Sequence, residues 1–457
     1  MKKVWILTVV SLIIISFVLS FSFIGCKSTE SATTAAAQSS ESGATSAETS
    51  KAAETTVAQG EKPELIFWQN EAGSGLSQWY KDVVADINAN ENFTVKIVEN
   101  PATDMIDKLT AAGVSQSGFD FTWDWSGSFS TLARGMNGLY QPVNKLLSES
   151  VISSLTAGTV GANTDSEGNI WGVPFFLDAV TMAYNLKILK DAGVDTANLP
   201  KTYDEFVEVC QKVKDSGAIP SAFANKEGIM NEYWGEDMLQ SYFDTVEEHK
   251  EFWNSGKYVD NPDMKDAVEK YKNLYDKGYL NPEGKTLDYA SNFYSQFASG
   301  KVASIWFIHS LYVSTIKEGQ IKDEDVGYQL LPSFGNGKLK DDVQSLGYLL
   351  CIAKWTKYPN ECAKAISYFV SDKWQKKLVE YGTIPALATI KFDDMSTLTP
   401  NLKFIFDDAK GQFTESPYAL LKSTNQYDAL IRNLTPFLNG ETDYKTFATA
   451  IEEATNE

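Results

Sequence analysis

The chain has 457 residues, of which 43% are hydrophobic and 12% aromatic, enough for a real core and for two domains or one large bilobal unit. Its formal net charge is −20, which argues against a nucleic-acid partner and against binding to a membrane surface through basic residues. Arginine occurs only at positions 134 and 432, so recognition of phosphate or carboxylate groups by arginine is not expected to dominate.

Cysteine and histidine are also scarce. The chain has four cysteines and two histidines: Cys26, Cys210, Cys351, Cys362, His249 and His309. No two cysteines form a CxxC pair, so we expect neither a metal centre nor a cofactor. If Cys26 carries a lipid, an odd number of cysteines remains. We interpret these three as small buried apolar side chains rather than as disulfide partners.

The first segment is typical of secretion. Two lysines precede an apolar run over residues 4–24, which is long enough for a signal peptide or an uncleaved anchor. Its end, Phe23-Ile24-Gly25-Cys26, resembles a bacterial lipobox, with Phe23 where leucine is usual. We therefore predict a lipoprotein signal peptide over residues 1–25 and lipidation of Cys26, with a plain transmembrane anchor as the alternative.

A polar tether is predicted next. Residues 28–62 are rich in Ser, Thr, Ala, Glu and Gln and have almost no large apolar side chain. Such a segment cannot bury enough surface to fold, so we predict that residues 26–62 form a lipidated and disordered tether. As a coil it would span about 30–35 Å.

Strands and helices alternate from Glu64 onward. Ser74 is a candidate N-cap for the first helix, whose apolar face carries Trp79, Val83, Val84 and Ile87. A second helix is predicted over Asp104–Val114, and the strands are Glu64–Trp68, Phe93–Val98 and Phe119–Trp125. This alternation predicts an α/β sheet.

The stretch from Gly168 to Lys187, GNIWGVPFFLDAVTMAYNLK, combines a Gly-rich turn, an apolar strand and a helix that opens at Tyr184-Asn185. Pro174 lacks a backbone donor, so it fits poorly in a central strand and better where the chain passes between sheets. Asp178 lies inside the apolar run. A carboxylate there is costly to bury unless a partner or a ligand satisfies it.

The remaining chain continues the pattern. Residues 201–217 form a helix with Thr202 as its cap and Glu205 three residues later, which is a capping box. Gly300 is a natural helix terminator before a strand. Further helices are predicted over Asp266–Tyr279, Tyr289–Gly300, Asn360–Tyr381 and within Pro400–Ile451, and further strands over Lys301–Ile308 and Ser345–Ala353.

Motifs for catalysis are absent from the sequence. It has no dinucleotide fingerprint, no GxSxG elbow and no P-loop. Glu71, Asp124 and Asp178 could be offered as a glycosidase pair, but no signature joins them. We interpret His309 as a satisfied or ligand-contacting histidine rather than a general base, and we predict that the protein is not an enzyme.

Tryptophan instead accompanies polar side chains at three strand ends: Trp68 with Asn70 and Glu71, Trp123 with Asp124 and Trp125, and Trp306 with His309. Sugars present apolar C–H faces and polar hydroxyl edges, which aromatic rings and short polar groups can match. Ligands of open α/β sheets lie beyond the carboxyl ends of the strands. Any one of these tryptophans could equally belong to the core.

An ordered set of motifs resembles one family. After the lipobox and tether come Gly172-Val173-Pro174, Tyr184-Asn185, Pro200–Phe206 (PKTYDEF), Phe297-x-x-Gly300-Lys301, Leu330–Phe334 (LLPSF) and Gly382-x-x-Pro385. Over Glu64–Glu457 the chain resembles the extracellular solute-binding proteins of family 1, the carbohydrate-binding lipoproteins of ABC importers to which maltose-binding protein belongs.

The resemblance implies an α/β fold of the two-lobed, periplasmic-binding-protein-like type II, with lobes joined by hinge crossings. Residues 63–175 with 333–382 would form lobe 1, and residues 176–332 with 383–457 lobe 2. The implied function is capture of a sugar or oligosaccharide by lobe closure and its delivery to a membrane permease. The resemblance also implies a monomer that is lipid-anchored at the outer face of the cell membrane, or on its periplasmic side.

The same resemblance suggests ligand contacts, aligned most loosely in lobe 2. The expected ligand-binding residues are Trp68, Asn70, Glu71, Trp123, Asp124, Trp125, Asp178, Tyr233, Trp234, Trp306, His309, Tyr348 and Tyr418. Two other classes stay open: a solute-binding protein for a non-sugar, such as a peptide, and a glycan-active enzyme.

Overall fold

The computed structural model describes residues 62–69, 75–101, 104–127, 130–233, 238–390, 398–408, 413–415 and 420–457. The chain separates into two units, Met1–Gly60 and Glu61–Glu457, and every described residue belongs to the second. The predicted signal peptide, the lipidated Cys26 and nearly all of the tether lie outside the described residues.

The described strands join into a single mixed sheet with the main order β2-β1-β3-β9-β5-β7-β6. β1 runs parallel to β2 and β3, and β6 runs parallel to β7, as expected of α/β units. β9 and β5 are antiparallel to each other and to their outer neighbours β3 and β7. The strands are β1 (Glu64–Gln69), β2 (Thr94–Glu99), β3 (Phe121–Trp125), β4 (Tyr140–Gln141), β5 (Val173–Asn185), β6 (Ile219–Ser221), β7 (Val302–Ile308), β8 (Val326–Gln329), β9 (Val343–Ala353), β10 (Ile384–Pro385) and β11 (Phe413–Glu415).

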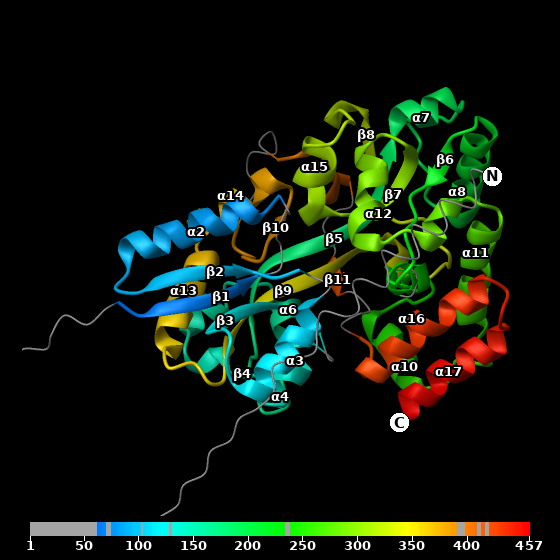
Figure 1. The fold of residues 1–457 in the computed structure, drawn as a ribbon. Helices are drawn as coiled ribbons and strands as arrows, with labels where there is room; N and C mark the ends of the chain where they lie inside the picture. Colours follow the sequence, from blue (N-terminus) through cyan, green and yellow to red (C-terminus); the bar gives the residue numbers. More distant parts are fainter. Residues whose placement is uncertain are drawn as a thin grey trace, which may run out of the picture. The chain divides into compact units, whose positions relative to one another are not determined.

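Helices flank both halves of the sheet. In Figure 1, α2, α3 and α13 lie around the half that carries β1–β3, and α8, α11 and α12 lie around the half that carries β6 and β7. The α-helices are α2 (Ser77–Asn90), α3 (Met105–Ser115), α4 (Thr131–Met136), α5 (Glu149–Ile152), α6 (Ala157–Ala162), α7 (Leu186–Asp191), α8 (Tyr203–Asp215), α9 (Met230–Tyr233), α10 (Val246–Ser255), α11 (Pro262–Asp276), α12 (Tyr289–Ala298), α13 (Pro359–Phe369), α14 (Asp372–Leu378), α15 (Pro400–Lys403), α16 (Thr424–Leu438) and α17 (Tyr444–Asn456). Within the described residues, none of these is both long and apolar enough to span a bilayer.

Local sequence signals account for several helix ends. Thr202 accepts a hydrogen bond from the Glu205 amide, and the Glu205 carboxylate accepts one from the Thr202 amide, so the predicted capping box of α8 is confirmed. Gly300, just after α12, has a φ of +68°, which only glycine adopts without strain. The predicted apolar face of α2 is buried.

β5 and β9 link the two halves of the sheet. With 13 and 11 residues they are its longest strands. β9 pairs with β3 of one half, β5 pairs with β7 of the other, and the two pair with each other. Pro174 lies inside β5 rather than between two sheets, and the pairing with β9 shifts register between Pro174 and Phe176. The missing N–H group of Pro174 thus falls at an irregular position in the pairing of β5 with β9. β5 continues to Asn185, whose side chain caps α7.

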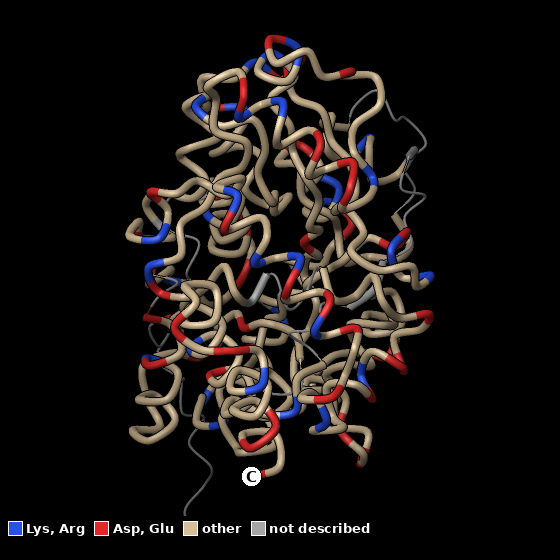
Figure 2. Tube along the Cα trace, turned by 90° about the vertical axis from the view of Figure 1, so that its right-hand side faces the viewer, with Lys and Arg blue, Asp and Glu red and all other residues tan. Residues whose placement is uncertain are grey.

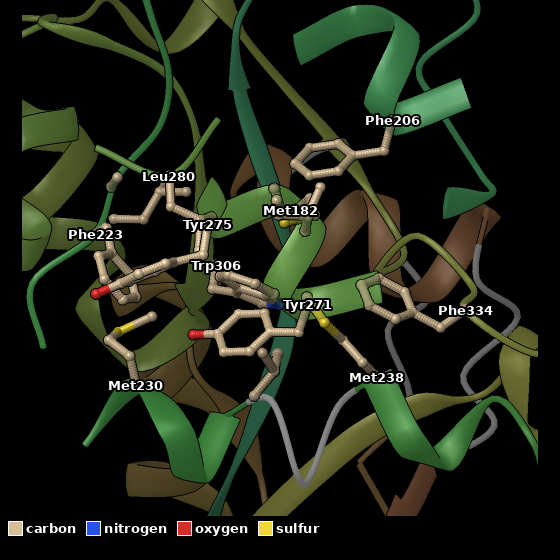
Figure 3. Close-up of a cluster of buried hydrophobic side chains, with 14 of the residues drawn as sticks. Met182, Phe206, Phe223, Met230, Met238, Tyr271, Tyr275, Leu280, Trp306 and Phe334 are labelled. Atoms are coloured by element: carbon tan, nitrogen blue, oxygen red, sulfur yellow. The ribbon is translucent and has the colours of Figure 1, made fainter. Parts of the chain in front are cut away.

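Each half of the sheet has its own core. Around β1–β3 the buried side chains include Phe67, Trp79 and Phe369. Around β6 and β7 they include Trp306 and Tyr271, which lie together in Figure 3. Cys210, Cys351 and Cys362 are free and buried, which confirms their interpretation as small core side chains.

Charged residues of both signs are interspersed along the trace in Figure 2. The ion pairs between described residues are mostly partly exposed, and exposed pairs of this kind contribute little to stability. The fold therefore depends mainly on its apolar cores.

Both histidines are buried and neutral, which makes stability sensitive to acid. His249 accepts a hydrogen bond from the Trp253 indole at 2.9 Å, and His309 lies between Thr181 and Asn401. Burial lowers the pKa of each imidazole from 6.5 to about 3. Between these values the unfolded chain binds more protons than the folded one, so stability falls as pH falls from 6.5 toward 3, by up to about 1.4 kcal/mol per pH unit for each histidine.

We expect His249→Gln, which keeps an acceptor for Trp253 but cannot titrate, to remove about half of the histidine contribution to this slope. Urea unfolding midpoints measured between pH 6.5 and 5 would check the prediction. The control is Lys250→Gln, at an exposed position of the same helix α10. Parallel pH profiles for His249→Gln and the unmodified protein would contradict it.

Candidate ligand-binding site

One face of the sheet runs without interruption from one core to the other. Side chains directly opposite each other on paired strands share a face, and alternate residues of one strand share it too. Trp125 pairs with Tyr348, Asp178 with Leu346, and Val180 with Ile308. By the same alternation Trp123, Phe176, Met182 and Trp306 lie on this face as well.

The two ends of this face are buried, whereas its middle contains partly exposed side chains. Trp123 and Trp306 are 1% and 2% exposed, each inside the core of its own half. Trp125, Leu346 and Ile308 are partly exposed. We call Trp125, Leu346, Tyr348, Asp178 and Ile308 the central strip. Because Trp125 and Leu346 pack against the cores of both halves, the strip lies at their junction.

Aromatic rings support the strip from one side. The Trp125 ring packs edge-on against Trp123, with centroids 4.8 Å apart, and Trp123 packs edge-on against Tyr348 at 5.1 Å. Tyr348 in turn stacks on Phe176 at 4.4 Å. Such contacts fix ring orientation, so the strip presents an ordered aromatic surface.

Asp178 supplies the charged group of the strip. It is 1% exposed, and its carboxylate accepts hydrogen bonds from the Ser310 amide at 2.8 Å, the Ser310 hydroxyl at 2.5 Å and the Ala179 amide at 3.1 Å. These donors stabilise a carboxylate that would otherwise be costly to bury. Ser310, directly after β7, thereby joins the site.

Two tyrosines of α12 lie beside the strip. The Tyr294 hydroxyl is 3.2 Å from that of Tyr289. Burial raises the pKa of Tyr294 well above its ordinary value, and the nearby Tyr289, Asp178 and Tyr348 raise it further. Its hydroxyl therefore stays protonated at neutral pH and can donate a hydrogen bond near Asp178.

Directly behind the central strip, the opposite face of the sheet is covered by other side chains. Leu177 and Ala179, which alternate with the residues of the strip, pack in a core cluster with Ile384, Leu402 and Ile405. These last three belong to the segment that follows α14. A ligand can therefore approach the junction of the halves from the side of the central strip.

Several predicted site residues lie away from the strip. Trp68 and Asp124 point to the opposite face, because they alternate with Phe67 and Trp123. Asp124 is fully buried and pairs with Arg134. His309 is also fully buried, and both of its ring nitrogens have protein partners.

Trp306 is in the interior of its half, surrounded in Figure 3 by Met182, Tyr271 and Met238. In this structure it packs the core rather than lining the junction. Asn70, Glu71, Trp234 and Tyr418 lie outside the described residues, and of Tyr233 the structure describes only the backbone, at the end of α9.

The strip itself therefore contains three of the predicted residues, Trp125, Asp178 and Tyr348. The sequence interpretation missed Leu346, Tyr289 and Tyr294 as site residues. Tyr289 and Tyr294 read as ordinary helix positions, and only the packing of α12 brings them to β5 and β9. The position of Ser310 after Trp306 and His309 was a usable signal for a residue at the strand end.

A groove of about 810 Å³ lies elsewhere, beside β8, and its lining includes Lys201, Tyr328, Leu331, Lys340 and Phe404. No predicted site residue lines it, so we place the candidate site at the strip. Within the described residues, no group of three or more His, Cys, Asp or Glu side chains could hold a metal ion.

Three relatives share sequence with the chain. The sn-glycerol-3-phosphate-binding periplasmic protein UgpB of Agrobacterium fabrum is 32% identical over 95 residues, which is 20% of this chain and 22% of that protein. The maltotriose-binding protein of Pyrococcus abyssi is 25% identical over 170 residues, 35% and 33% of the two chains. The chain thus matches only about a fifth and a third of these two proteins. The diacetylchitobiose-binding protein DasA of Streptomyces coelicolor is 23% identical over 83% of both chains.

Solved structures share the fold. A chitin oligosaccharide binding protein superposes with a TM-score of 0.75 at 20% identity, covering 87% of this chain and 99% of the other. Maltose-bound MalE3 of T. maritima gives 0.70 at 17% identity, covering 86% and 99%. The predicted two-lobed type II α/β fold is thereby confirmed.

The family model described as bacterial extracellular solute-binding protein matches residues 72–376, about two thirds of the chain, and so covers β9 and β5 together with the whole central strip. The chain belongs to the bacterial extracellular solute-binding protein family.

Proposed function

We propose that this protein binds an oligosaccharide between its two lobes and presents it to the permease of an ABC importer. The observation that carries the proposal is the central strip, in which Trp125 and Tyr348 adjoin the Asp178 carboxylate at the junction of two cores. Aromatic faces suit the C–H surface of a pyranose, and the carboxylate and the Ser310 and Tyr294 hydroxyls suit its OH groups. The names of the maltotriose and diacetylchitobiose relatives support the same ligand class.

Capture takes place by a shift between open and closed forms. A ligand that contacts both lobes only when they are closed favours closure by its difference in affinity for the two forms. We place lobe 1 at residues 63–175 with 333–382 and lobe 2 at 176–332 with 383–457. The two large cores, one with Phe67 and Phe369 and one with Trp306 and Leu434, support a division into two lobes. Near the crossings Phe334 packs in the second core and Leu387 in the first. No bond is made or broken.

The N-terminal segment anchors the protein. Cleavage before Cys26 and diacylation of its thiol would hold a monomer at the outer face of the cell membrane, because two acyl chains give stable attachment. The tether over residues 26–62 would let the lobes reach the permease. The Phe23–Cys26 motif supports this part of the proposal.

A non-sugar solute is the alternative, and the relative named for sn-glycerol-3-phosphate supplies a specific candidate. The arginines of this chain favour sugar instead. Arg134 pairs with the buried Asp124, and Arg432 pairs with Asp428 one helical turn away. Both guanidinium groups are thus engaged by carboxylates rather than held ready for a phosphate.

We expect Trp125→Ala to weaken oligosaccharide binding at least about tenfold, since truncating a central aromatic contact costs about 1.4 kcal/mol or more. The measurement is calorimetric titration with maltotriose, diacetylchitobiose and glycerol 3-phosphate. The control is Trp171→Ala, a partly exposed tryptophan that packs with Leu349 and Cys351 on the opposite sheet face.

Three outcomes would count against the proposal. Binding of glycerol 3-phosphate alone would favour the non-sugar alternative, and release of shorter sugars from the titrated oligosaccharides would identify an enzyme. Equal affinity of Trp125→Ala and the unmodified protein would remove the site from the central strip.

The two lobes approach each other closely at a glycine, Gly75. Gly75 precedes α2 in lobe 1, and Val313 begins the π-helical turn η6 (Val313–Lys317) after β7 in lobe 2. A Cβ atom on Gly75 would lie 2.3 Å from the Val313 Cβ. No rotamer change relieves such a clash, because the backbone fixes both Cβ atoms.

We therefore expect Gly75→Ala to keep the lobes apart, which lowers oligosaccharide affinity and raises the radius of gyration of the ligand-saturated protein in X-ray scattering. Val313→Gly in the same chain should restore both quantities. Gly161→Ala is the control, since a Cβ there meets nothing within 4 Å. The prediction fails if Gly75→Ala closes as fully as this control.

A further inference from the structure

Asp124 does not lie on the central strip, but its hydrogen bonds connect it to Trp125, which does. In the sequence Asp124 stands between Trp123 and Trp125. Its carboxylate is fully buried on the face of the sheet opposite to these two tryptophans. It pairs with Arg134 and accepts a hydrogen bond from the Tyr140 hydroxyl at 2.8 Å. Its Oδ1 atom also accepts a hydrogen bond from the Trp125 amide at 2.9 Å.

The Trp125 backbone is held from its other side as well. Its carbonyl accepts hydrogen bonds from the Ser130 and Thr131 hydroxyls, both at 2.7 Å. Ser130 and Thr131 are fully buried where α4 begins, and Arg134 follows one turn later on the same helix. The start of α4 therefore holds the Trp125 carbonyl, and its end holds Asp124, which holds the Trp125 amide.

The Tyr140 hydroxyl of this network stays protonated at neutral pH. Burial raises the pKa of Tyr140 well above its ordinary value, and the neighbouring Asp124 raises it further, so this hydroxyl remains a donor. The Arg134 side chain is 16% exposed, so the ion pair is largely removed from solvent. Removing one partner of such a pair leaves an uncompensated charge, which makes the arrangement hard to deform.

We propose that Asp124 and Arg134 are positioning residues that fix the Trp125 ring as a ligand platform, acting from the far face of the sheet and never touching the ligand. This inference rests on the proposed function for the identity of the ligand but not for the geometry. With the pair intact, the Trp125 ring keeps one orientation against Trp123. Without it, the strand end loses its contact with the end of α4, and the Trp125 amide loses the fixed acceptor that sets the ring plane.

The test is 19F NMR of ligand-free protein labelled with 5-fluorotryptophan, with the Trp125 signal assigned from Trp125→Phe. We expect one sharp Trp125 signal in the unmodified protein and a split or broadened signal in Asp124→Asn. The Trp355 signal, whose indole donates to the Phe119 carbonyl, should stay unchanged. Affinity for maltotriose or diacetylchitobiose should fall about tenfold.

Two further variants keep the test decisive. Asp428→Asn breaks an exposed ion pair elsewhere and should leave both the Trp125 signal and the affinity unchanged. Thr131→Val keeps the ion pair but removes one donor to the Trp125 carbonyl, so it should broaden the signal even if Asp124→Asn fails to fold.

The outcomes separate this inference from the proposed function. A single, unshifted Trp125 signal in Asp124→Asn and in Thr131→Val would overturn the positioning role, even in a protein that binds oligosaccharides. A perturbed signal in a protein that binds neither oligosaccharide would support the positioning role and overturn the proposed ligand class.

Discussion

β5 and β9 have to satisfy two cores at once, and the rest of the site depends on this constraint. β5 begins with Val173 in one core and ends with Tyr184 in the other, so it must be apolar at both ends. β9 places Tyr348, Leu350 and Ile352 in the first core and packs Leu346 against both. Because side chains alternate between faces, a one-residue slip in pairing would exchange the two faces along the whole length. Register is therefore strongly specified, and so is the position of the central strip between the cores.

The two faces of these strands have different neighbours at the junction. On one face, Leu177 and Ala179 are covered by the segment that contains Ile384 and Leu402. On the other, Trp125 and Leu346 keep part of their surface exposed while packing against both cores. A hinge motion about the shared strands would change the separation of the lobes most on the second face. Under the proposed function, this geometry would couple ligand contact with the strip to closure of the lobes.

Sequence periodicity predicted the longer strands, most helices and the α8 capping box, because these follow from local patterns. Trp125 was proposed from its place at a strand end, Asp178 from its place in an apolar run, and Tyr348 from the family resemblance. Periodicity did not show which tryptophans face a core, since Trp306 and Trp125 both end apolar strands and differ only in what packs over them. Nor did it find Tyr294, whose place beside Asp178 depends on the packing of a distant helix.

The contrast between Asp124 and Asp178 shows what a closer use of strand alternation could add. Both are carboxylates in apolar strands, and their positions in those strands together with the family resemblance made both candidate ligand contacts. Asp124 is flanked by two tryptophans that face the strip, so alternation turns its side chain into the scaffold, where it meets Arg134. Asp178 is flanked by Leu177 and Ala179, which face the covered side, so alternation turns it onto the strip. Because successive side chains of a strand point to opposite faces, a polar residue between two platform aromatics lies behind the platform, where we propose that Asp124 supports Trp125.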